Sequence, residues 1–318
     1  MISPDPTPAR SPLVSVVIPC RNHGAYLSIA VASVQAQDHQ SWECIIVDDG
    51  SIDGSAEIAA ALAARDTRIR LHRQPPRGLS AARNAGLHLA RGEYVQFLDA
   101  DDVIAPTKFS IQLSALVNAS RPALAYCDYS LATAGDAPAR PASYLSPRLA
   151  GARPVLDLAA RWEKNLSIPA HCFLFDRQLF SGGAIRFDEA LPSHEDWDCW
   201  MEIFRAEPTV RYVDMKLATY VIRADSICSN RSRMRRGFLQ ALRKQQEHSR
   251  DDQQMRVVLT AKLADVRRAY RDCSRVDRIR YLATRSLFRL GARLLPSPAC
   301  NLVRVRLQTW LRTRGWSL

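Results

Sequence analysis

The feature that most restricts the fold is a repeated alternation between short apolar runs and helical stretches over the first 105 residues. Short continuous apolar runs that end at turn residues are typical of buried strands. The runs cover residues 13–19, 43–47, 68–72 and 93–98, and the helical patterns between them cover residues 25–37, 53–64 and 79–90. Strands that alternate with helices form parallel sheets through right-handed crossovers, so we predict an α/β fold with a doubly wound, mostly parallel sheet flanked by helices.

The second half of the chain is less regular. Residues 132–154 are rich in Ala, Pro, Gly and Ser and predict an irregular excursion, whereas residues 195–204 have the spacing of a helix. Residues 209–213 and 216–222 predict two more strands. We therefore divide the chain into a flexible tail, a sheet-containing domain and a basic, mainly helical C-terminal region, at residues 1–12, 13–225 and 226–318.

Charge is distributed unevenly between these regions. Residues 226–318 hold 22 Lys and Arg against 6 Asp and Glu, a net charge of +16, whereas the first 225 residues hold 22 against 26, a net charge of −4. The stretches 281–295 and 303–311 mix arginine with leucine and aromatic residues, a composition that suits an anionic membrane surface. The alternative is a helical subdomain that packs on the rest of the chain or on another subunit. No nucleic-acid reader motif is present, so we expect no nucleic-acid partner.

Cellular location can be inferred only from what the sequence lacks. Residues 1–12 have no apolar core of a signal peptide, and no run approaches 18 uncharged apolar residues. The eight cysteines form no CxxC pair, which gives a zinc site no support. We therefore expect a cytoplasmic protein with reduced thiols. If the basic region binds a membrane, we expect the protein to be peripheral on the inner face of that membrane.

The strongest chemical signal is a group of three carboxylates, Asp99, Asp101 and Asp102, directly after the fourth predicted strand. Neighbouring carboxylates repel one another unless a cation or hydrogen-bond donors neutralise them. Hard divalent cations such as Mg²⁺ and Mn²⁺ bind through one or two carboxylates together with substrate phosphates. The segment therefore favours a metal and diphosphate site. The alternative is an acidic turn before a helix that begins at Pro106.

Two weaker signals accompany this segment. Asp48 and Asp49 end the second predicted strand, where a carboxylate could accept hydrogen bonds from a nucleobase or a ribose, or could simply form a turn. Glu195 and Asp196 open a predicted helix, where the helix dipole stabilises carboxylates. A carboxylate at that position could also act as a general base toward an acceptor hydroxyl.

Taken together, the segments resemble the family 2 glycosyltransferases, which have the GT-A fold. The likeness covers roughly residues 13–225. The segments that carry it, in chain order, are residues 14–27, 43–55, 78–86, 92–102 and 187–198. Five motifs in the family's order are more specific than any one of them alone.

On the donor side, the resemblance implies roles for seven residues. Pro19 and Asn22 would lie in the loop that cradles the nucleobase. Asp49, with Asp48 as a second candidate, would hydrogen-bond the base. Arg83 would neutralise donor charge. Asp99 would contact the ribose or the donor sugar, and Asp101 would ligate Mn²⁺ or Mg²⁺ beside the diphosphate.

At the metal and on the acceptor side, the resemblance is less complete. The family often has Arg-x-His after its last sheet strand, and here the stretch reads Arg223-Ala224-Asp225. Asp225 would offer an oxygen in place of the imidazole, beside Asp99 and Asp101, so the third metal ligand is open. Asp196 would be the general base, with Glu195 as the alternative.

The activity that the resemblance implies is a metal-dependent, inverting transfer of a sugar from a nucleotide-sugar donor, with UDP-sugars as the first expectation. The acceptor would be a saccharide or a lipid-linked acceptor in the synthesis of cell-surface polysaccharide or glycolipid. A catalytically silent protein that binds a nucleotide-sugar as a regulatory or scaffold module is the main alternative. A nucleotidyltransferase would need a Gly-rich phosphate loop after the first strand, which residues 19–24 do not form.

Overall fold

The computed structural model describes residues 11–133, 140–141, 145–223 and 230–269. Its named elements, in chain order, are β1 (Val14–Cys20), α1 (Gly24–Gln35), β2 (Trp42–Asp49), α2 (Ser55–Arg65), β3 (Ile69–Gln74), α3 (Leu79–Leu89), β4 (Tyr94–Phe97), β5 (Val103–Ile104), α4 (Lys108–Leu116), β6 (Ala123–Thr133), β7 (Arg140–Pro141), α5 (Pro154–Arg161), η1 (Ala170–Cys172), β8 (Phe173–Asp176), η2 (Arg177–Gly183), α6 (Glu195–Arg205), β9 (Thr209–Ile222) and α7 (Arg231–His248). Residues 253–269 form a further helix.

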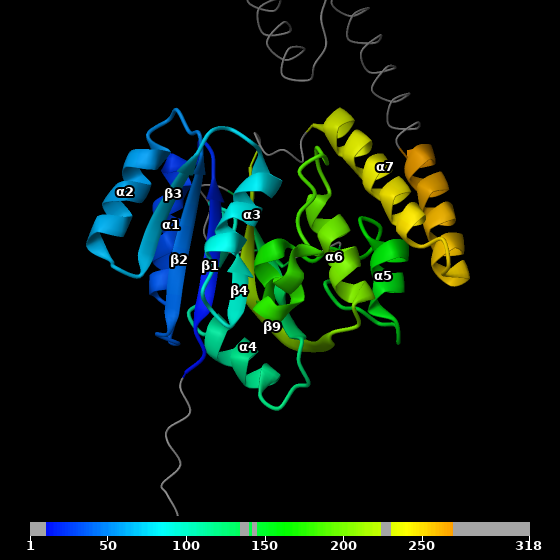
Figure 1. Ribbon diagram of the computed structural model, residues 1–318, viewed down its shortest axis with the longest axis horizontal. Helices are drawn as coiled ribbons and strands as arrows, with labels where there is room; N and C mark the ends of the chain where they lie inside the picture. The colour runs from blue at the N-terminus through cyan, green and yellow to red at the C-terminus, as the bar shows by residue number, and fades with distance from the viewer. Residues whose placement is uncertain (1–10, 134–139, 142–144, 224–229, 270–318) are drawn as a thin grey trace, which may run out of the picture.

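A single mixed sheet organises the molecule. Its strand order is β3-β2-β1-β4-β8-β6-β9-β5, and β7 pairs with β6. The four strands at the β3 side run parallel, as predicted, whereas β8 and β5 run antiparallel to their neighbours. Figure 1 shows β1 to β4 and helices α1 to α3 on one side of the molecule, and α5, α6 and α7 gathered on the other. The predicted α/β class is confirmed, and the second half of the sheet is more mixed than the first.

The strand β1 shows why the apolar runs of the sequence are continuous. All seven of its residues are buried. Val14, Val16 and Ile18 belong to one hydrophobic cluster, and Val17 belongs to the cluster on the opposite face. A strand covered on both faces needs apolar residues at every position, which removes the alternation of a half-exposed strand.

Three predicted boundaries are wrong in detail. The two strands expected at 209–213 and 216–222 are one strand, β9. Its pairing with β6 shifts register at Asp214 and Met215 and again at Leu217, and the first of these irregularities lies between the two expected strands. Helix α4 begins at Lys108, two residues after Pro106. Strand β6 continues to Thr133, inside the segment predicted to be irregular.

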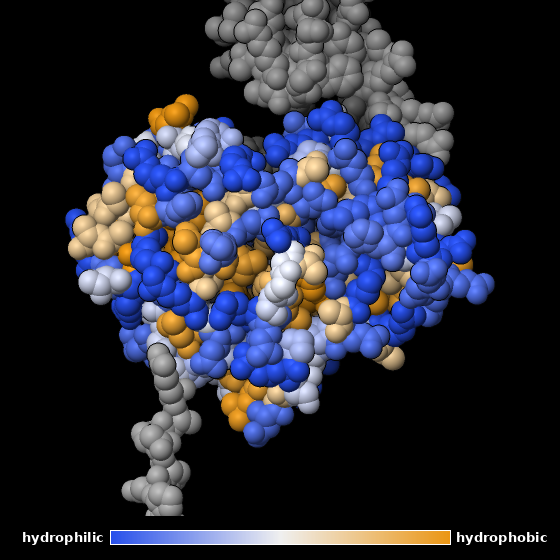
Figure 2. Space-filling view, in the orientation of Figure 1, coloured by the Kyte–Doolittle hydropathy of each residue, from blue (hydrophilic) through white to orange (hydrophobic). Residues whose placement is uncertain are grey.

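The first part of the predicted C-terminal region packs on the second half of the molecule. Phe238, Ala241 and Leu242 of α7 are buried in the cluster that also holds Trp197 and Trp200 of α6. Figure 2 shows that the surface over α7 in this view is predominantly hydrophilic. Within the residues that the structure describes, no helix has the length and apolarity needed to cross a membrane. The basic stretches 281–295 and 303–311 lie outside the described residues.

Candidate active site

A cavity of about 950 Å³ opens where the parallel strands end, between the two halves of the molecule. Its walls come from the ends of β1, β2 and β4, the N-terminus of α3, the segment before α6, and the start of α7. Such an edge is where open α/β sheets bind ligands. The predicted site residues that line it are Pro19, Asn22, Asp49, Arg83, Asp99, Asp101, Glu195 and Asp196. Asp48 is not among the lining residues, and Asp225 lies outside the described residues.

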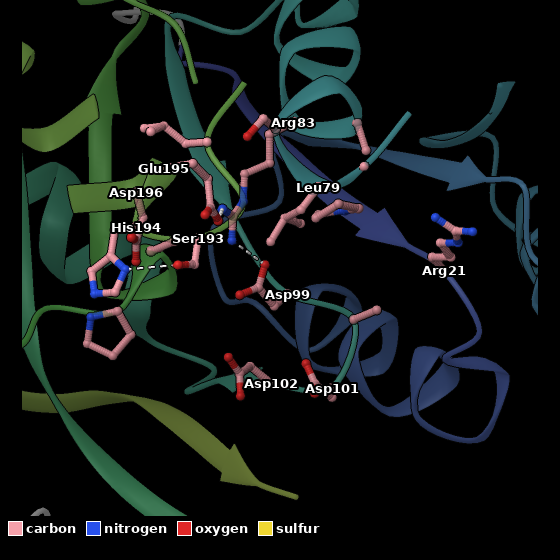
Figure 3. Close-up of a pocket in the computed structure, with 18 of the residues that line it drawn as sticks. Arg21, Leu79, Arg83, Asp99, Asp101, Asp102, Ser193, His194, Glu195 and Asp196 are labelled. Atoms are coloured by element: carbon pink, nitrogen blue, oxygen red, sulfur yellow. Dashed lines mark hydrogen bonds and ion pairs between the residues drawn. The ribbon is translucent and has the colours of Figure 1, made fainter. Parts of the chain in front are cut away.

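Arg83 joins the two sides of this cavity. Its Nη2 donates to Asp99 Oδ1 at 2.8 Å and its Nη1 donates to Glu195 Oε1 at 2.8 Å, while its side chain is only 3 % exposed. Figure 3 shows the guanidinium of Arg83 reaching from α3 to lie between these two carboxylates. The guanidinium also lies 5.2 Å from the ring of Phe187. Arg83 therefore fixes the carboxylate after β4 relative to the first turn of α6.

Asp49 organises a loop rather than standing free. One of its oxygens accepts from Gln74 Nε2 and from the backbone N–H of Arg77, and the other accepts from the backbone N–H of Gly78, each at 2.8 Å. Gly78 has a φ of 97°, in the region that favours glycine. Asp49 thus holds the turn that leads into α3 and so places Arg83.

The loop after β1 is tied to the loop after β2. The backbone N–H of Asn22 donates to Ser51 Oγ at 3.0 Å, and Asn22 Oδ1 accepts from the backbone N–H of Ile52 at 2.9 Å. Asp48, which is buried, accepts from the backbone N–H of Ser51 at 3.2 Å. Asn22 and Asp48 therefore shape the rim of the cavity through backbone contacts.

Asp101 has the chemistry of a ligand to a hard cation. Burial, followed by the charges of Asp102 and Asp99, raises the pKa of Asp101 to about 7, and the nearby Arg223 offsets part of this rise. Arg223 Nη1 lies 3.2 Å from Asp101 Oδ2. Within the described part of the chain, no group of three or more His, Cys, Asp or Glu side chains lies close enough to hold a metal ion. The residues present therefore fit a cation that takes one or two carboxylates from the protein and its other ligands from a diphosphate and water.

The neighbouring Asp102 has a structural task that the sequence did not show. Its Oδ1 accepts from the backbone N–H of Val221 at 2.7 Å, and its Oδ2 lies 2.9 Å from Nδ1 of the buried His171. These contacts fasten the acidic turn to β9 and to the segment before β8. Asp102 is thereby removed from the set of carboxylates that face the cavity freely.

The two predicted catalytic carboxylates occupy the first turn of α6 and differ in their contacts. Glu195 is bound by Arg83, whereas Asp196 Oδ1 accepts a bond from the backbone N–H of Trp197 at 2.7 Å. Burial, followed by the charge of Glu195, raises the pKa of Asp196 to about 6, while Arg83 lowers it in part. Asp196 thus keeps an oxygen for a ligand and has a pKa suited to general-base catalysis near neutral pH.

His194, to which the sequence assigned no role, is a fixed part of the cavity wall. It has a left-handed backbone with a φ of 61°, an uncommon conformation for a residue that is not glycine. Its Nε2 lies 3.0 Å from Glu163 Oε1, and its ring stacks on Phe238 with centroids 4.2 Å apart. A histidine just before a helix of acidic residues was the only local signal, and it does not reveal these long-range partners.

The family assignment comes from sequence comparison. The family model described as Glycosyl transferase family 2 matches residues 15–181. TuaG of Bacillus subtilis, whose name places it in teichuronic acid biosynthesis, is 32 % identical over 221 residues, which cover 69 % of this chain and 83 % of TuaG. The glycosyltransferase EpsJ of Bacillus subtilis is 30 % identical over 66 % of this chain, and a Haemophilus influenzae glycosyltransferase is 42 % identical over 32 % of it. These matches span 61 % and 42 % of the two relatives, less than two thirds of either.

Solved structures with a similar fold have low sequence identity. Staphylococcus aureus TarS in complex with UDP-GlcNAc has a TM-score of 0.62 and 18 % identity, covering 80 % of this chain and 71 % of the TarS chain. The mannosyltransferase PcManGT from Pyrobaculum calidifontis, in complex with GDP-Man and Mn²⁺, has a TM-score of 0.59 and 17 % identity, covering 98 % and 85 % of the two chains. At this identity the likeness shows the fold alone, and that fold is GT-A, as predicted.

Proposed function

The chain belongs to glycosyl transferase family 2, and from this membership we propose that it transfers a sugar from a nucleoside-diphosphate sugar to an acceptor hydroxyl in one inverting displacement. The observation that carries the proposal is the bridge made by Arg83. Arg83 links Asp99 of the acidic turn to Glu195 in the first turn of α6, and both carboxylates line one cavity. A transferase needs such an arrangement because its donor and acceptor must meet in one place.

In the proposed reaction, Asp196 accepts the proton of the acceptor hydroxyl. The acceptor oxygen then forms a bond to the anomeric carbon, the bond from that carbon to the diphosphate breaks, and its electron pair leaves with the nucleoside diphosphate. One displacement of this kind inverts the anomeric centre. Arg83 keeps Asp99 beside the donor and Glu195 beside the base while this happens, so neither carboxylate has to be reorganised.

A divalent cation, Mn²⁺ or Mg²⁺, would be held by Asp101 together with the donor diphosphate, and Asp99 could supply a second carboxylate. When bound, it would supply Lewis-acid stabilisation of the charge on the leaving diphosphate. Arg223, which lies beside Asp101, would add a second positive charge at the same end of the cavity. The Mn²⁺ named in the complex of the structural neighbour PcManGT supports this choice of cation.

For the substrates, we propose a UDP-sugar donor and an acceptor used in a cell-surface polymer or glycolipid, either a saccharide or a lipid-linked saccharide. The UDP-GlcNAc bound by TarS and the role named for TuaG support this choice, whereas the GDP-Man bound by PcManGT keeps a GDP-sugar as the second donor to test. The predicted attachment to an anionic membrane surface concerns residues beyond 269 and stays a prediction. Flotation of the full chain with anionic vesicles at low salt would test it.

The experiment that tests the function is nucleotide binding followed by thermal unfolding. We expect UDP or GDP to raise the melting temperature of the full chain only with Mn²⁺, because a ligand that binds the folded state stabilises it by mass action. Asp101→Asn should abolish this shift, and the matched control Asp251→Asn, at an exposed position, should keep it. If no nucleotide causes a shift that depends on Mn²⁺ in the wild type, the proposed metal-dependent donor site is refuted, whereas a shift without release of the nucleoside diphosphate from its sugar would favour the catalytically silent alternative.

A further inference from the structure

Helix α7 contacts the segment directly before the predicted base. Arg233 Nε donates to the carbonyl oxygen of Pro192 at 2.6 Å, and Ser193 Oγ lies 3.3 Å from the carbonyl oxygen of Arg233. The ring of Phe238 lies parallel to that of His194, with an angle of 3° between the two planes. Three successive residues before α6 therefore each contact α7, and the next two residues of the chain are Glu195 and Asp196.

The approach of α7 to this segment is so close that it requires glycine. A Cβ atom placed on Gly237 would lie 2.1 Å from Ser193 Oγ, 2.6 Å from Ser193 O and 2.8 Å from Ser193 N. Separations under 3 Å from backbone atoms cannot be relieved by rotating a side chain, so any larger residue at 237 must displace α7 or residue 193. Because Ser193 is only three residues before Asp196, its displacement would be passed to the first turn of α6.

A second set of contacts fixes α7 along the body of α6. Lys244 Nζ lies 2.7 Å from Asp198 Oδ2 and 2.7 Å from Asp188 Oδ2. Gln245 Nε2 donates to Asp198 Oδ1 at 2.7 Å and to Glu202 Oε1 at 2.8 Å. Asp198 is fully buried, so its charge needs these partners. The two helices are thus held both at the N-terminus of α6 and one to two turns further along.

The start of α7 also borders the cavity itself. Arg233 and Met234 are among its lining residues, beside Pro192, Ser193 and His194. The family match ends at residue 181, before all of these residues. The sequence division at residue 225 likewise separates Arg233 and Met234 from the other residues that line the cavity.

We propose that α7 is a positioning element of the transferase, which sets the geometry of the acceptor-side base through Gly237 and Arg233 and forms the acceptor end of the cavity. This inference rests on the proposed function. A helix that only stabilised the fold would, when perturbed, weaken nucleotide binding and thermal stability together. A positioning helix would change the base and leave the distant donor loops intact, because those loops come from β1, β2 and β4.

The test compares Gly237→Ala and Arg233→Gln with the matched control Arg236→Gln, which removes the same charge from an exposed position of α7. Arg233→Gln leaves the helix sequence otherwise intact and serves if Gly237→Ala does not fold. In the full chain, amide hydrogen exchange of residues 193–198 should be about tenfold faster in both test variants and unchanged in the control. The assay needs no known acceptor, since exchange is measured on the protein alone.

The second readout is release of UDP from UDP-GlcNAc, or of GDP from GDP-mannose, with Mn²⁺ and water as the acceptor. We expect kcat to fall about tenfold or more in both test variants, since a misplacement near 1 Å can cost about a hundredfold. The Kd for UDP or GDP should stay within about twofold of wild type, because the donor loops come from β1, β2 and β4. A twofold change in Kd corresponds to about 0.4 kcal/mol of binding free energy. The acid limb of the pH profile should also move, as the surroundings of Asp196 change.

The possible failures are distinguishable. Unchanged exchange at residues 193–198 and unchanged kcat in both test variants would overturn the positioning role. A parallel loss of nucleotide binding and thermal stability would assign α7 a structural role only. If the wild-type chain releases no diphosphate from either donor, the proposed function fails for these donors, and the exchange measurement still decides whether α7 controls the base segment.

Discussion

Replacing Arg83 by methionine should be the most informative single change, because one side chain connects the two sides of the cavity. Methionine keeps an unbranched apolar stem and removes two charge-assisted hydrogen bonds of 2.8 Å, to Asp99 and to Glu195. It leaves both carboxylates without that cation. Removing one partner of a buried ion pair typically costs about 3–5 kcal/mol.

The structure lets this figure be refined. Glu195 is 12 % exposed and Asp99 is 30 % exposed, so water can solvate part of each charge that Arg83 abandons. We therefore expect a loss of about 2–4 kcal/mol in the free energy of unfolding. For a domain of this size, each kcal/mol lost lowers the melting temperature by roughly 2–4 °C. We therefore expect the melting temperature to fall by roughly 5–15 °C.

The same change should alter the pH dependence of the reaction. The positive charge of Arg83 lowers the pKa of Asp196, so its removal raises that pKa, and a higher pH is then needed to deprotonate the base. The acid limb of the activity profile should therefore move to higher pH in Arg83→Met. This shift separates an electrostatic effect on the base from a general loss of folded protein.

The assay is thermal unfolding of the full chain by calorimetry, with donor-derived UDP or GDP release measured from pH 5 to 9. Arg21→Met is the control, because Arg21 lies at the same cavity but is 52 % exposed and 3.8 Å from Asp49, so that pair contributes about 0–1 kcal/mol. Glu195→Gln added to Arg83→Met should recover part of the lost stability. A melting temperature for Arg83→Met within about 2 °C of wild type would refute the reasoning.

Three further predictions follow from single residues. Asp196→Asn should lower the rate of diphosphate release by about 10²–10⁴-fold with UDP or GDP binding unchanged, as expected for loss of a general base; an equal loss of binding would contradict that role. In the wild type, the rate should fall about tenfold per pH unit below about pH 6, because the raised pKa of Asp196 protonates the base there; a flat profile to pH 5 would exclude Asp196 as the base. Burial lowers the pKa of Lys108 to about 8, so the unfolded state binds more protons than the folded state between pH 8 and 10.5, and stability from this group should rise over that interval. Lys108→Met should remove this rise, which chemical unfolding at pH 8 and pH 10 would measure, whereas an identical pH dependence in both proteins would show that Lys108 is not the group responsible.

The sequence predicted the parts of the site that follow directly from strand ends. Continuous apolar runs placed β1, β2 and β4 correctly. Because parallel strands bring their carboxyl ends to one edge, Asn22, Asp49 and Asp101 converge there. The helix that carries Glu195 and Asp196 was also predicted within one residue of its observed bounds. These features depend on local patterns and on one topological rule.

What the sequence could not predict depends on contacts between distant segments. Arg83 was expected to neutralise donor charge, which stays a prediction, and the sequence did not show that it also binds Glu195, which is 112 residues away in the chain. Asp48 carries the same carboxylate as its neighbour Asp49, and only the direction of each side chain decides that Asp49 lines the cavity and Asp48 does not. The close packing of Gly237 against Ser193 cannot be recognised from the sequence around either residue.

The bridge at Arg83 also has a thermodynamic consequence for the order of ligand binding. Under the proposed function, a donor that bound Asp99 would compete with Arg83, which also binds Glu195 on the other side of the cavity. Occupancy of the donor side would then be linked to the geometry of the acceptor side. Any such linkage is reciprocal, so an acceptor analogue would change the affinity for the nucleotide by the same factor as the nucleotide changes the affinity for the analogue.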